Sequence, residues 1–254
     1  MTRHAITKIR HELRRRTLTV ASIEDVTPGM RRVHFSSPDL ADFNSAGFDD
    51  HVKMFIPGPG AEGPATEAER PAMRDFTPRL FDTGACTLAL DYAMHDAGPA
   101  IDWAKTAKPG DTLEIGGPRG SAVMTDDFDW YWFIGDETAL PAIGRRLEEL
   151  RAGVPVATFV AVDSAQEAQA IATATRWTPE WVVRDGRDDA AALIAATEKV
   201  PFPEGEGFVW IAAEAMIARA VRAAIEARGH PRAWLKASGY WQRGDPGVHI
   251  RIED

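Results

Sequence analysis

The sequence predicts two domains of different class: an antiparallel β domain, then an α/β domain with a parallel sheet. In the first half, from Arg16 to about Thr125, short runs of alternating apolar and polar residues are separated by turns rich in Gly and Pro. After Asp129, short apolar runs alternate with segments whose apolar residues recur every three or four positions. A chain of 254 residues is long enough for two domains. We place them at 1–124 and 125–254, because a Pro-Arg-Gly turn and an acidic stretch interrupt the pattern between 118 and 129.

The first half is expected to contain strands at 16–26, 30–37, 51–57, 86–94 and 111–117. The first two are joined by a turn at Thr27-Pro28-Gly29. Strands of this length and spacing are typical of an antiparallel barrel or a sandwich. The segment 57–74, PGPGAEGPATEAERPAMR, is expected to be a polar loop between strands.

The second half is expected to contain strands at 130–135, 155–162, 181–183 and 208–212. A helix follows the first strand, because apolar residues recur there at Leu140, Ile143, Leu147 and Leu150. A second helix is expected at 188–197. A third is expected to bury Met216, Ile217, Ala220, Val221, Ala224 and Ile225 and to end at Gly229. This alternation predicts a parallel sheet with helices on both faces.

Composition excludes several classes of function. With 29 Lys and Arg against 38 Asp and Glu, the formal charge of −9 argues against general nucleic-acid binding. No apolar run is long enough to span a membrane, and no apolar stretch follows the basic N-terminal residues, so we expect a cytoplasmic protein without membrane insertion. We read the basic N-terminal stretch as a frayed, solvated segment. Cys86 is the single cysteine, and the seven histidines show no metal-ligand spacing, so no metal site is expected.

Three motifs are expected to meet in a cleft between the two domains, where ligands of such folds usually bind. In RDFTPR (74–79), an arginine can bind a phosphate and an aromatic ring lies two residues further on the same strand face. In HDAGPAIDWA (95–104), small residues allow close backbone approach, and the first helical turn offers N–H groups to an anion. Each motif also has a purely structural interpretation, as a solvated strand end and as the cap of a short core helix.

The third motif, GDETALPA (135–142), is a strand-to-helix turn. Gly135 permits a tight turn, but Asp136 and Glu137 make the motif by itself a poor pyrophosphate cradle, and simple N-capping also explains it.

These motifs, with VTPGMRRVHF, HVKMFIP, KPGDTLEIGGPRGS, FVWIAAEA and SGYWQRG, resemble the siderophore-interacting proteins, a branch of the ferredoxin reductase-like superfamily of flavoenzymes. The resemblance covers nearly the whole chain, and GDETALPA and GYWxxG are its most specific motifs. It implies an N-terminal Greek-key β-barrel that binds FAD. It also implies a Rossmann-like NAD(P)H-binding domain whose C-terminal segment returns to the flavin cleft.

The resemblance assigns roles to individual residues. Arg74 would bind an FAD phosphate, Phe76 would pack along the flavin, and Thr77 would reach its ring or ribityl edge. Ile101 departs from the small or hydroxyl residue of many members, so the pyrophosphate there would rely on backbone N–H groups. The other expected cofactor-binding residues are Asp91, Tyr92, His95, Gly98, Pro99, Ala100, Trp103, Gly135, Asp136, Glu137, Thr138, Tyr240 and Trp241.

The implied activity is that of an FAD-dependent ferric-siderophore reductase. Electrons from NAD(P)H, or from reduced ferredoxin, would pass through FAD to the Fe(III) of a siderophore and release Fe(II). The flavin would carry the chemistry, so no catalytic side chain is expected. Lys53 and Arg119 match basic positions of the chelate pocket, and Lys236 is a third candidate.

The donor preference rests on the second parallel strand, which ends at Asp163-Ser164. An acidic residue there favours the ribose of NADH, although Arg184 after the next strand could accept the 2′-phosphate of NADPH.

Two alternatives to this function remain at the level of sequence. The chain could be a binding protein that sequesters a ferric chelate without catalysis, or a flavin reductase of the same architecture with another electron acceptor. Intact flavin motifs favour the enzymes. The expected partners are a ferric siderophore and, as an alternative donor, ferredoxin, and the expected oligomeric state is a monomer.

Overall fold

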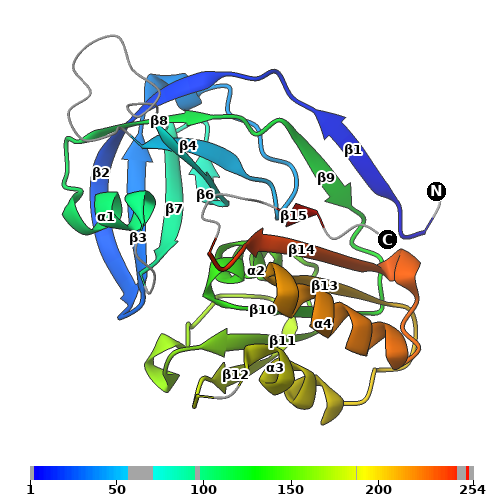
Figure 1. Cartoon of the computed structure of the whole chain (residues 1–254). Coiled ribbons are helices and arrows are strands. Elements are labelled where there is room, and N and C mark those ends of the chain that lie inside the picture. Colours follow the sequence, from blue (N-terminus) through cyan, green and yellow to red (C-terminus); the bar gives the residue numbers. More distant parts are fainter. Residues whose placement is uncertain (1–2, 57–70, 95–97, 187, 245–249, 252–254) are drawn as a thin grey trace. The chain divides into compact units, whose positions relative to one another are not determined.

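The computed structural model describes residues 3–56, 71–94, 98–186, 188–244 and 250–251 (Figure 1). The chain divides into two compact units. The barrel unit comprises Thr7–Val123, and the α/β unit comprises Met1–Ile6 together with Met124–Asp254. Across the described ranges, no helix is both long and apolar enough to cross a membrane.

The barrel unit is built on a seven-stranded antiparallel sheet with the order β5-β4-β8-β2-β3-β7-β6. A short 3-10 helix, Pro38–Leu40, follows β3, and helix α1, Pro99–Thr106, follows β7. Strands β1 and β9 form a separate two-stranded sheet. The strands are β1 Ile6–Arg10, β2 Arg15–Thr27, β3 Met30–Ser36, β4 Val52–Ile56, β5 Ala72–Phe76, β6 Pro78–Asp82, β7 Thr87–Ala93, β8 Thr112–Gly116 and β9 Gly120–Met124.

The sheet of the barrel unit curls back on itself. Strands β5 and β6 lie at opposite edges of the strand order, yet only Thr77 separates them along the chain. Since one residue spans only about 3.5 Å, the two edges must come together at Thr77. The structure therefore confirms the expected antiparallel barrel and rules out the sandwich.

Alternation along the strands directs apolar side chains into the barrel. In β2, Leu18 and Val20 are buried while Thr17 and Thr19 between them are exposed. The turn at Thr27-Pro28-Gly29 joins β2 to β3, with Thr27 opposite Met30, as the sequence predicts. Because successive side chains of a strand point to opposite faces, a period of two residues places one face in the core and the other in solvent.

Several expectations for the barrel unit were wrong. Ala72–Phe76 forms β5, so the polar loop expected at 57–74 does not include these residues, and 57–70 lies outside the described residues. Ile6–Arg10 is a strand paired with β9, not a frayed segment. The strand expected from Cys86 begins one residue later, at Thr87: Cys86 has φ of 53°, and its half-buried Sγ donates to the carbonyl oxygen of Thr83.

The α/β unit contains a six-stranded sheet with the order β12-β11-β10-β13-β14-β15. The first five strands are parallel, and β15 is antiparallel to β14. Short 3-10 helices occupy Glu137–Ala139, Ala165–Glu167 and Arg232–Trp234. The other elements are β10 Trp130–Gly135, α2 Leu140–Glu149, β11 Pro155–Val162, β12 Arg176–Val183, α3 Asp189–Glu198, β13 Gly207–Glu214, α4 Ala215–Ala227, β14 Leu235–Trp241 and β15 Ile250–Arg251.

Helices cover both faces of this sheet, as predicted. Helices α3 and α4 cover one face (Figure 1), and residues of both helices share a core with Trp130 and Trp132 of β10. Tyr131 lies on the other face, where the guanidinium of Arg146 from α2 stands 5.6 Å from its ring. Taken in sequence order, the parallel strands follow the 3-2-1-4-5 arrangement of dinucleotide-binding folds.

The three helices were predicted correctly, but Ala220 and Ala224 of α4 are only half-buried. Gly229 has φ of +87° just beyond α4, so it ends the helix in the left-handed region as expected. Met216, by contrast, is 62% exposed and does not belong to the buried face. The buried stripe runs through Ile217, Val221 and Ile225, and Met216 lies one residue, about 100°, to its side.

Candidate functional site

Arg74 and Phe76 lie on the same face of β5, as their spacing predicts. They stand opposite Met54 and Val52 of β4, both of which point into the barrel core. Arg74 is half-buried, and the one hydrogen bond of its guanidinium within the described residues runs to the carbonyl oxygen of Met73, at 2.8 Å. A guanidinium has five N–H donors, and the described residues engage only one of those of Arg74.

Phe76 is the first ring of an aromatic series that continues into the barrel. Its centroid lies 4.6 Å from that of Tyr92, which in turn lies 5.9 Å from that of Trp103 in α1. Tyr92 is fully buried, and its hydroxyl donates to the sulfur of Met54. Burial, with the nearby charge of Asp91, raises the pKa of Tyr92 well above its usual value, so the phenol stays neutral. Phe76 and Trp103 are only partly buried and border the core.

Asp91 forms a buried ion pair that the sequence analysis missed. Its carboxylate accepts from Nε and Nη2 of Arg32 at 2.6 and 2.8 Å, and Nε of Arg79 lies 4.0 Å away. Arg32 and Asp91 stand directly opposite each other on β3 and β7. Strand register was the missing signal, since nothing along the chain links residues 32 and 91. The structure thus places Asp91 beneath the surface, in contact with Arg32 and Arg79.

At the start of α1, no side chain of the described residues caps the first helical turn, whose N–H groups the sequence assigns to an anion. Gly98 is the N-cap, Pro99 is the first helical residue, and no side chain caps the helix. Ala100 is buried, and Ile101 packs against the barrel core. His95 lies outside the described residues.

Lys53 and Arg119 differ in their electrostatic surroundings. Nζ of Lys53 lies 2.8 Å from Oδ1 of Asp75, its cross-strand neighbour. Because side chains alternate along β4 and β5, this pair lies on the face opposite to Arg74. Arg119 is exposed, and among the described residues no carboxylate pairs with its guanidinium. Much of the charge of Lys53 is therefore already neutralised, and that of Arg119 is not.

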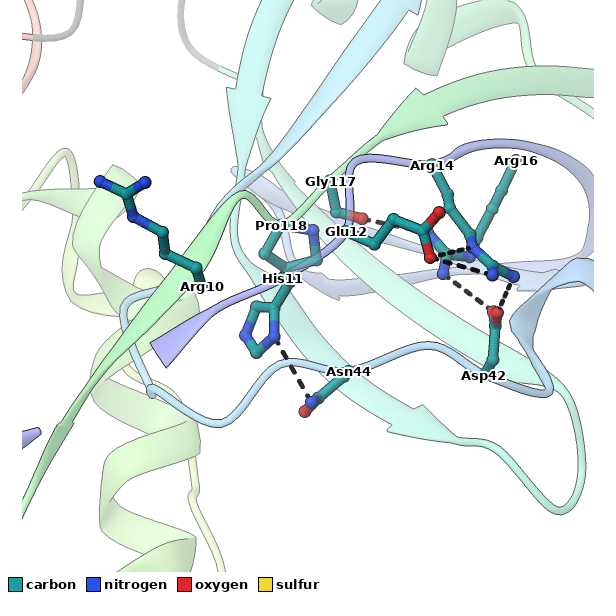
Figure 2. Close-up of a pocket in the computed structure, with 9 residues that line it drawn as sticks. All are labelled: Arg10, His11, Glu12, Arg14, Arg16, Asp42, Asn44, Gly117 and Pro118. Atoms are coloured by element: carbon teal, nitrogen blue, oxygen red, sulfur yellow. Dashed lines mark hydrogen bonds and ion pairs between the residues drawn. The ribbon is translucent and has the colours of Figure 1, made fainter. Parts of the chain in front are cut away.

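The barrel unit also holds a polar pocket of about 250 Å³ that contains none of the expected site residues (Figure 2). Arg14 pairs there with Glu12 and Asp42, and Arg16 donates to Asp42 at 2.9 Å. These internal pairs already engage Arg14 and Arg16 with the two carboxylates of the pocket. Its lining residues are Arg10, His11, Glu12, Arg14, Arg16, Asp42, Asn44, Gly117 and Pro118.

In the α/β unit, GDETALPA forms the turn after β10. A Cβ on Gly135 would lie 2.2 Å from the carbonyl oxygen of Ala212 and 2.6 Å from Cβ of Ala139. Both distances are below any normal contact. Glycine is therefore required here for close packing of β10 against β13 and the first helical turn.

Asp136 joins three segments. One carboxylate oxygen accepts from the N–H and hydroxyl of Thr138, and the other accepts from the N–H of Glu214 and from Nε1 of Trp241, at 3.1 and 2.9 Å. The residue is 1% exposed. Four donors thus stabilise this buried carboxylate, and Asp136 holds Trp241 against the turn.

Glu137 is buried in an ion pair with Arg184. Burial raises the pKa of Glu137, and the bidentate contact with Arg184 opposes this shift. Asp163 and Asp189 also accept from Arg184, at 2.8 and 2.7 Å.

Glu214, at the end of β13, was not identified from the sequence. Its carboxylate accepts from the N–H groups of Met216 and Ile217 and so caps α4, and it also accepts from the N–H of Arg243. Tyr240 packs edge-on against Trp210, 5.9 Å between centroids. Lys236 of β14 is half-buried and stands opposite Trp210 of β13.

The expected residues thus gather into two groups. In the barrel unit, Arg74, Phe76, Thr77, Tyr92 and Trp103 lie around β5, β7 and α1. In the α/β unit, Asp136, Thr138 and Trp241 form one hydrogen-bonded cluster directly after Gly135, with Glu137 in the neighbouring ion pairs.

Comparisons with known proteins give concordant matches to both units. Residues 19–122 match the family model of the siderophore-interacting FAD-binding domain, and residues 128–244 match that of siderophore-interacting protein. An NADPH-dependent ferric-chelate reductase of Escherichia coli is 34% identical, over 92% of this chain and 95% of its own length. A ferric vibriobactin reductase of Vibrio cholerae is 28% identical over 86% of each chain. The crystal structure of a siderophore utilization protein from T. fusca is 35% identical, with a TM-score of 0.87 over 96% of this chain and 98% of that one.

Proposed function

Because this chain belongs to the siderophore-interacting protein family, we propose that it is an FAD-dependent ferric-siderophore reductase. The observation that carries the proposal is in the barrel unit, within the segment that matches an FAD-binding domain. A guanidinium with free donors, an aromatic ring beside it and an uncapped helix N-terminus are the groups that a flavin dinucleotide requires.

The functional groups of these residues match the phosphates and the ring of FAD. Arg74 binds a phosphate through charge-assisted hydrogen bonds, and the N–H groups at the start of α1 bind the pyrophosphate. Phe76 packs along the flavin ring, and Thr77 donates or accepts at its edge. When bound, FAD would supply the redox chemistry: it would accept one hydride, which carries two electrons, and pass these on one at a time, which suits reduction of Fe(III) to Fe(II).

The buried residues behind this surface act as positioning residues. Tyr92 supports the ring of Phe76 from within the core. Asp91 fixes β7 to β3 through Arg32, and so holds the strand that carries Tyr92. Neither side chain needs to touch FAD to serve its binding.

The α/β unit serves the electron donor. Its strand order places the turn after β10 and the end of β13 at the switch point, where dinucleotides bind in such sheets. NAD(P)H is the donor, and reduced ferredoxin is the alternative. The E. coli relative is named as NADPH-dependent.

The acceptor is an Fe(III) chelate with anionic oxygen ligands. Lys53, Arg119 and Lys236 draw it towards the flavin, Arg119 most strongly because it has no carboxylate partner among the described residues. An electron weakens the hold of hard oxygen ligands on the iron, so reduction releases Fe(II). The protein works as a cytoplasmic monomer, with domains 1–124 and 125–254, and light scattering during gel filtration tests its mass.

The test starts from protein loaded with FAD under anaerobic conditions. NADH, NADPH or reduced ferredoxin should bleach the flavin absorbance, and addition of a ferric siderophore with an Fe(II) trap should restore it and colour the trap. Protein that binds the chelate but takes up no FAD would be a sequestering protein. Flavin that is reduced by the donor but not reoxidised by any ferric chelate would identify a reductase with another acceptor.

A further inference from the structure

Charged side chains converge at the carboxyl ends of three adjacent parallel strands. Glu137 follows β10, Asp163 follows β11 and Arg184 follows β12. In sheets with this strand order, an acidic residue after the second strand hydrogen-bonds the ribose that carries adenine. A nearby arginine can instead bind a 2′-phosphate on that ribose. The sequence favoured the ribose of NADH through Asp163, with Arg184 as a possible ligand of the 2′-phosphate of NADPH.

In the structure, Arg184 is already occupied. Nε donates to Asp189, Nη1 donates to Glu137 and Asp163, and Nη2 donates to Glu137. These bonds use four of the five N–H donors of a guanidinium. A phosphate could bind Arg184 only by displacing carboxylates.

Displacement is unfavourable because of where the carboxylates lie. The side chain of Glu137 is 4% exposed and that of Asp189 is 16% exposed. A buried carboxylate that loses its cationic partner is strongly destabilised. Three carboxylates around one guanidinium also leave the cluster with net negative charge, which repels a phosphate dianion.

Asp163 is the accessible member of the cluster. Its side chain is 57% exposed, and it receives Arg184 only at Oδ1. Within the described part of the chain, Oδ2 accepts no hydrogen bond and remains available to a ribose hydroxyl. An ionised carboxylate is a strong acceptor for such a donor.

We propose that Asp163 selects a dinucleotide with a free ribose 2′-hydroxyl, so that NADH rather than NADPH is the electron donor. Arg184 acts as a positioning residue that orients Asp163 and is withheld from phosphate by Glu137 and Asp189. This inference rests on the proposed reductase function, and it separates this chain from the E. coli relative named as NADPH-dependent.

The test measures binding without hydride transfer. Calorimetry on the FAD-loaded protein compares ADP-ribose with 2′-phospho-ADP-ribose, and we expect ADP-ribose to bind at least about tenfold more tightly. Asp163→Ser should weaken ADP-ribose about tenfold and bring the two ligands close to equal affinity, since the acceptor and one negative charge are lost. The exposed Glu180 of β12 provides a matched control, and Glu180→Gln should leave both affinities unchanged.

Tighter binding of 2′-phospho-ADP-ribose by the wild type would overturn the proposal, and so would an unchanged affinity ratio in Asp163→Ser. Failure of both ligands to bind would also overturn it. The proposed reductase function is tested separately, by reducing the bound flavin with dithionite and then adding the ferric chelate. Reoxidation in that experiment supports the reductase whatever the outcome for the donor.

Discussion

Asp136 is a buried carboxylate held by hydrogen-bond donors, and among the described residues no cation pairs with it. Its two oxygens each receive two donors, from Thr138 on one side and from Glu214 and Trp241 on the other. These four donors are all satisfied only if both side-chain atoms at position 136 are hydrogen-bond acceptors. Asp136 of the GDET motif is thus fully engaged in hydrogen bonds within the α/β unit.

Asp136→Asn is expected to destabilise the α/β unit by about 2–3 kcal/mol, because the amide NH₂ must face one pair of donors and leave it buried without an acceptor. Chemical denaturation followed by circular dichroism measures the change, and Trp241 fluorescence should shift as its N–H loses its partner. Asp188→Asn is the matched control, since asparagine caps α3 as well as aspartate does. Equal stability of the two variants would show that Asp136 has no such role.

Arg74→Ala should weaken FAD binding about ten- to a hundredfold, because a charge-assisted pair with phosphate contributes roughly 1.5–3 kcal/mol. Fluorescence titration of the apoprotein with FAD measures the dissociation constant. Arg119→Ala removes the same charge from the acceptor side and should leave the FAD affinity unchanged. A normal FAD dissociation constant in Arg74→Ala would refute the assignment.

The connection between α4 and β14 depends on a buried histidine. His230 follows the helix-ending Gly229, packs 5.7 Å from Trp130 and 5.4 Å from Phe202, and its Nε2 bonds to the carbonyl oxygen of Trp234. Burial lowers the pKa of His230, and the Trp234 carbonyl only partly opposes this shift. The folded state thus favours the neutral ring.

A histidine with a lowered pKa in the folded state stabilises the protein above its unfolded pKa of about 6.5 and loses that contribution as the pH falls. His230→Gln should therefore show a shallower loss of stability between pH 7 and pH 5, by about 1.4 kcal/mol for each unit by which the pKa is lowered. Urea denaturation at a series of pH values measures it. Identical slopes for the wild type and His230→Gln would contradict the prediction.

In the molecule as a whole, local charge matters more than the total of −9. An anionic triscatecholate complex should be steered to the flavin by Arg119 more than by Lys53, which Asp75 already neutralises. Arg119→Ala should raise the KM for this chelate and reduce the salt dependence of kcat/KM, and Lys53→Ala should do so less. Flavin reduction by the donor should change little.

Steady-state rates at two salt concentrations, with a triscatecholate and a neutral hydroxamate complex, measure these effects. The hydroxamate should be affected less than the triscatecholate. An equal decrease in kcat/KM for both chelates would mean that neither residue attracts the chelate through its charge. The chelate pocket would then lie elsewhere. Flavin content confirms that each variant is intact.

Periodicity along the chain was enough to predict the two fold classes, the β2–β3 hairpin and the helices α2, α3 and α4. Each of these is a local pattern, because burial on one side repeats every two or about 3.6 residues. The same reasoning missed β5, β6 and β14. The first two are short strands around Thr77, each interrupted by charged residues, and β14 lies in a segment that was recognised only as a terminal motif.

The motifs for FAD and for the donor could likewise be found in the sequence, since they are contiguous. Their partners could not. Asp136 meets Trp241 across 105 residues, and Arg32 meets Asp91 across 59. Glu137, Asp163 and Arg184 come together only because three parallel strands end at one edge of the sheet. Strand register and burial decide which charged side chains pair with one another inside the fold and which stay available to ligands. Both are set only when segments distant in the sequence pack together.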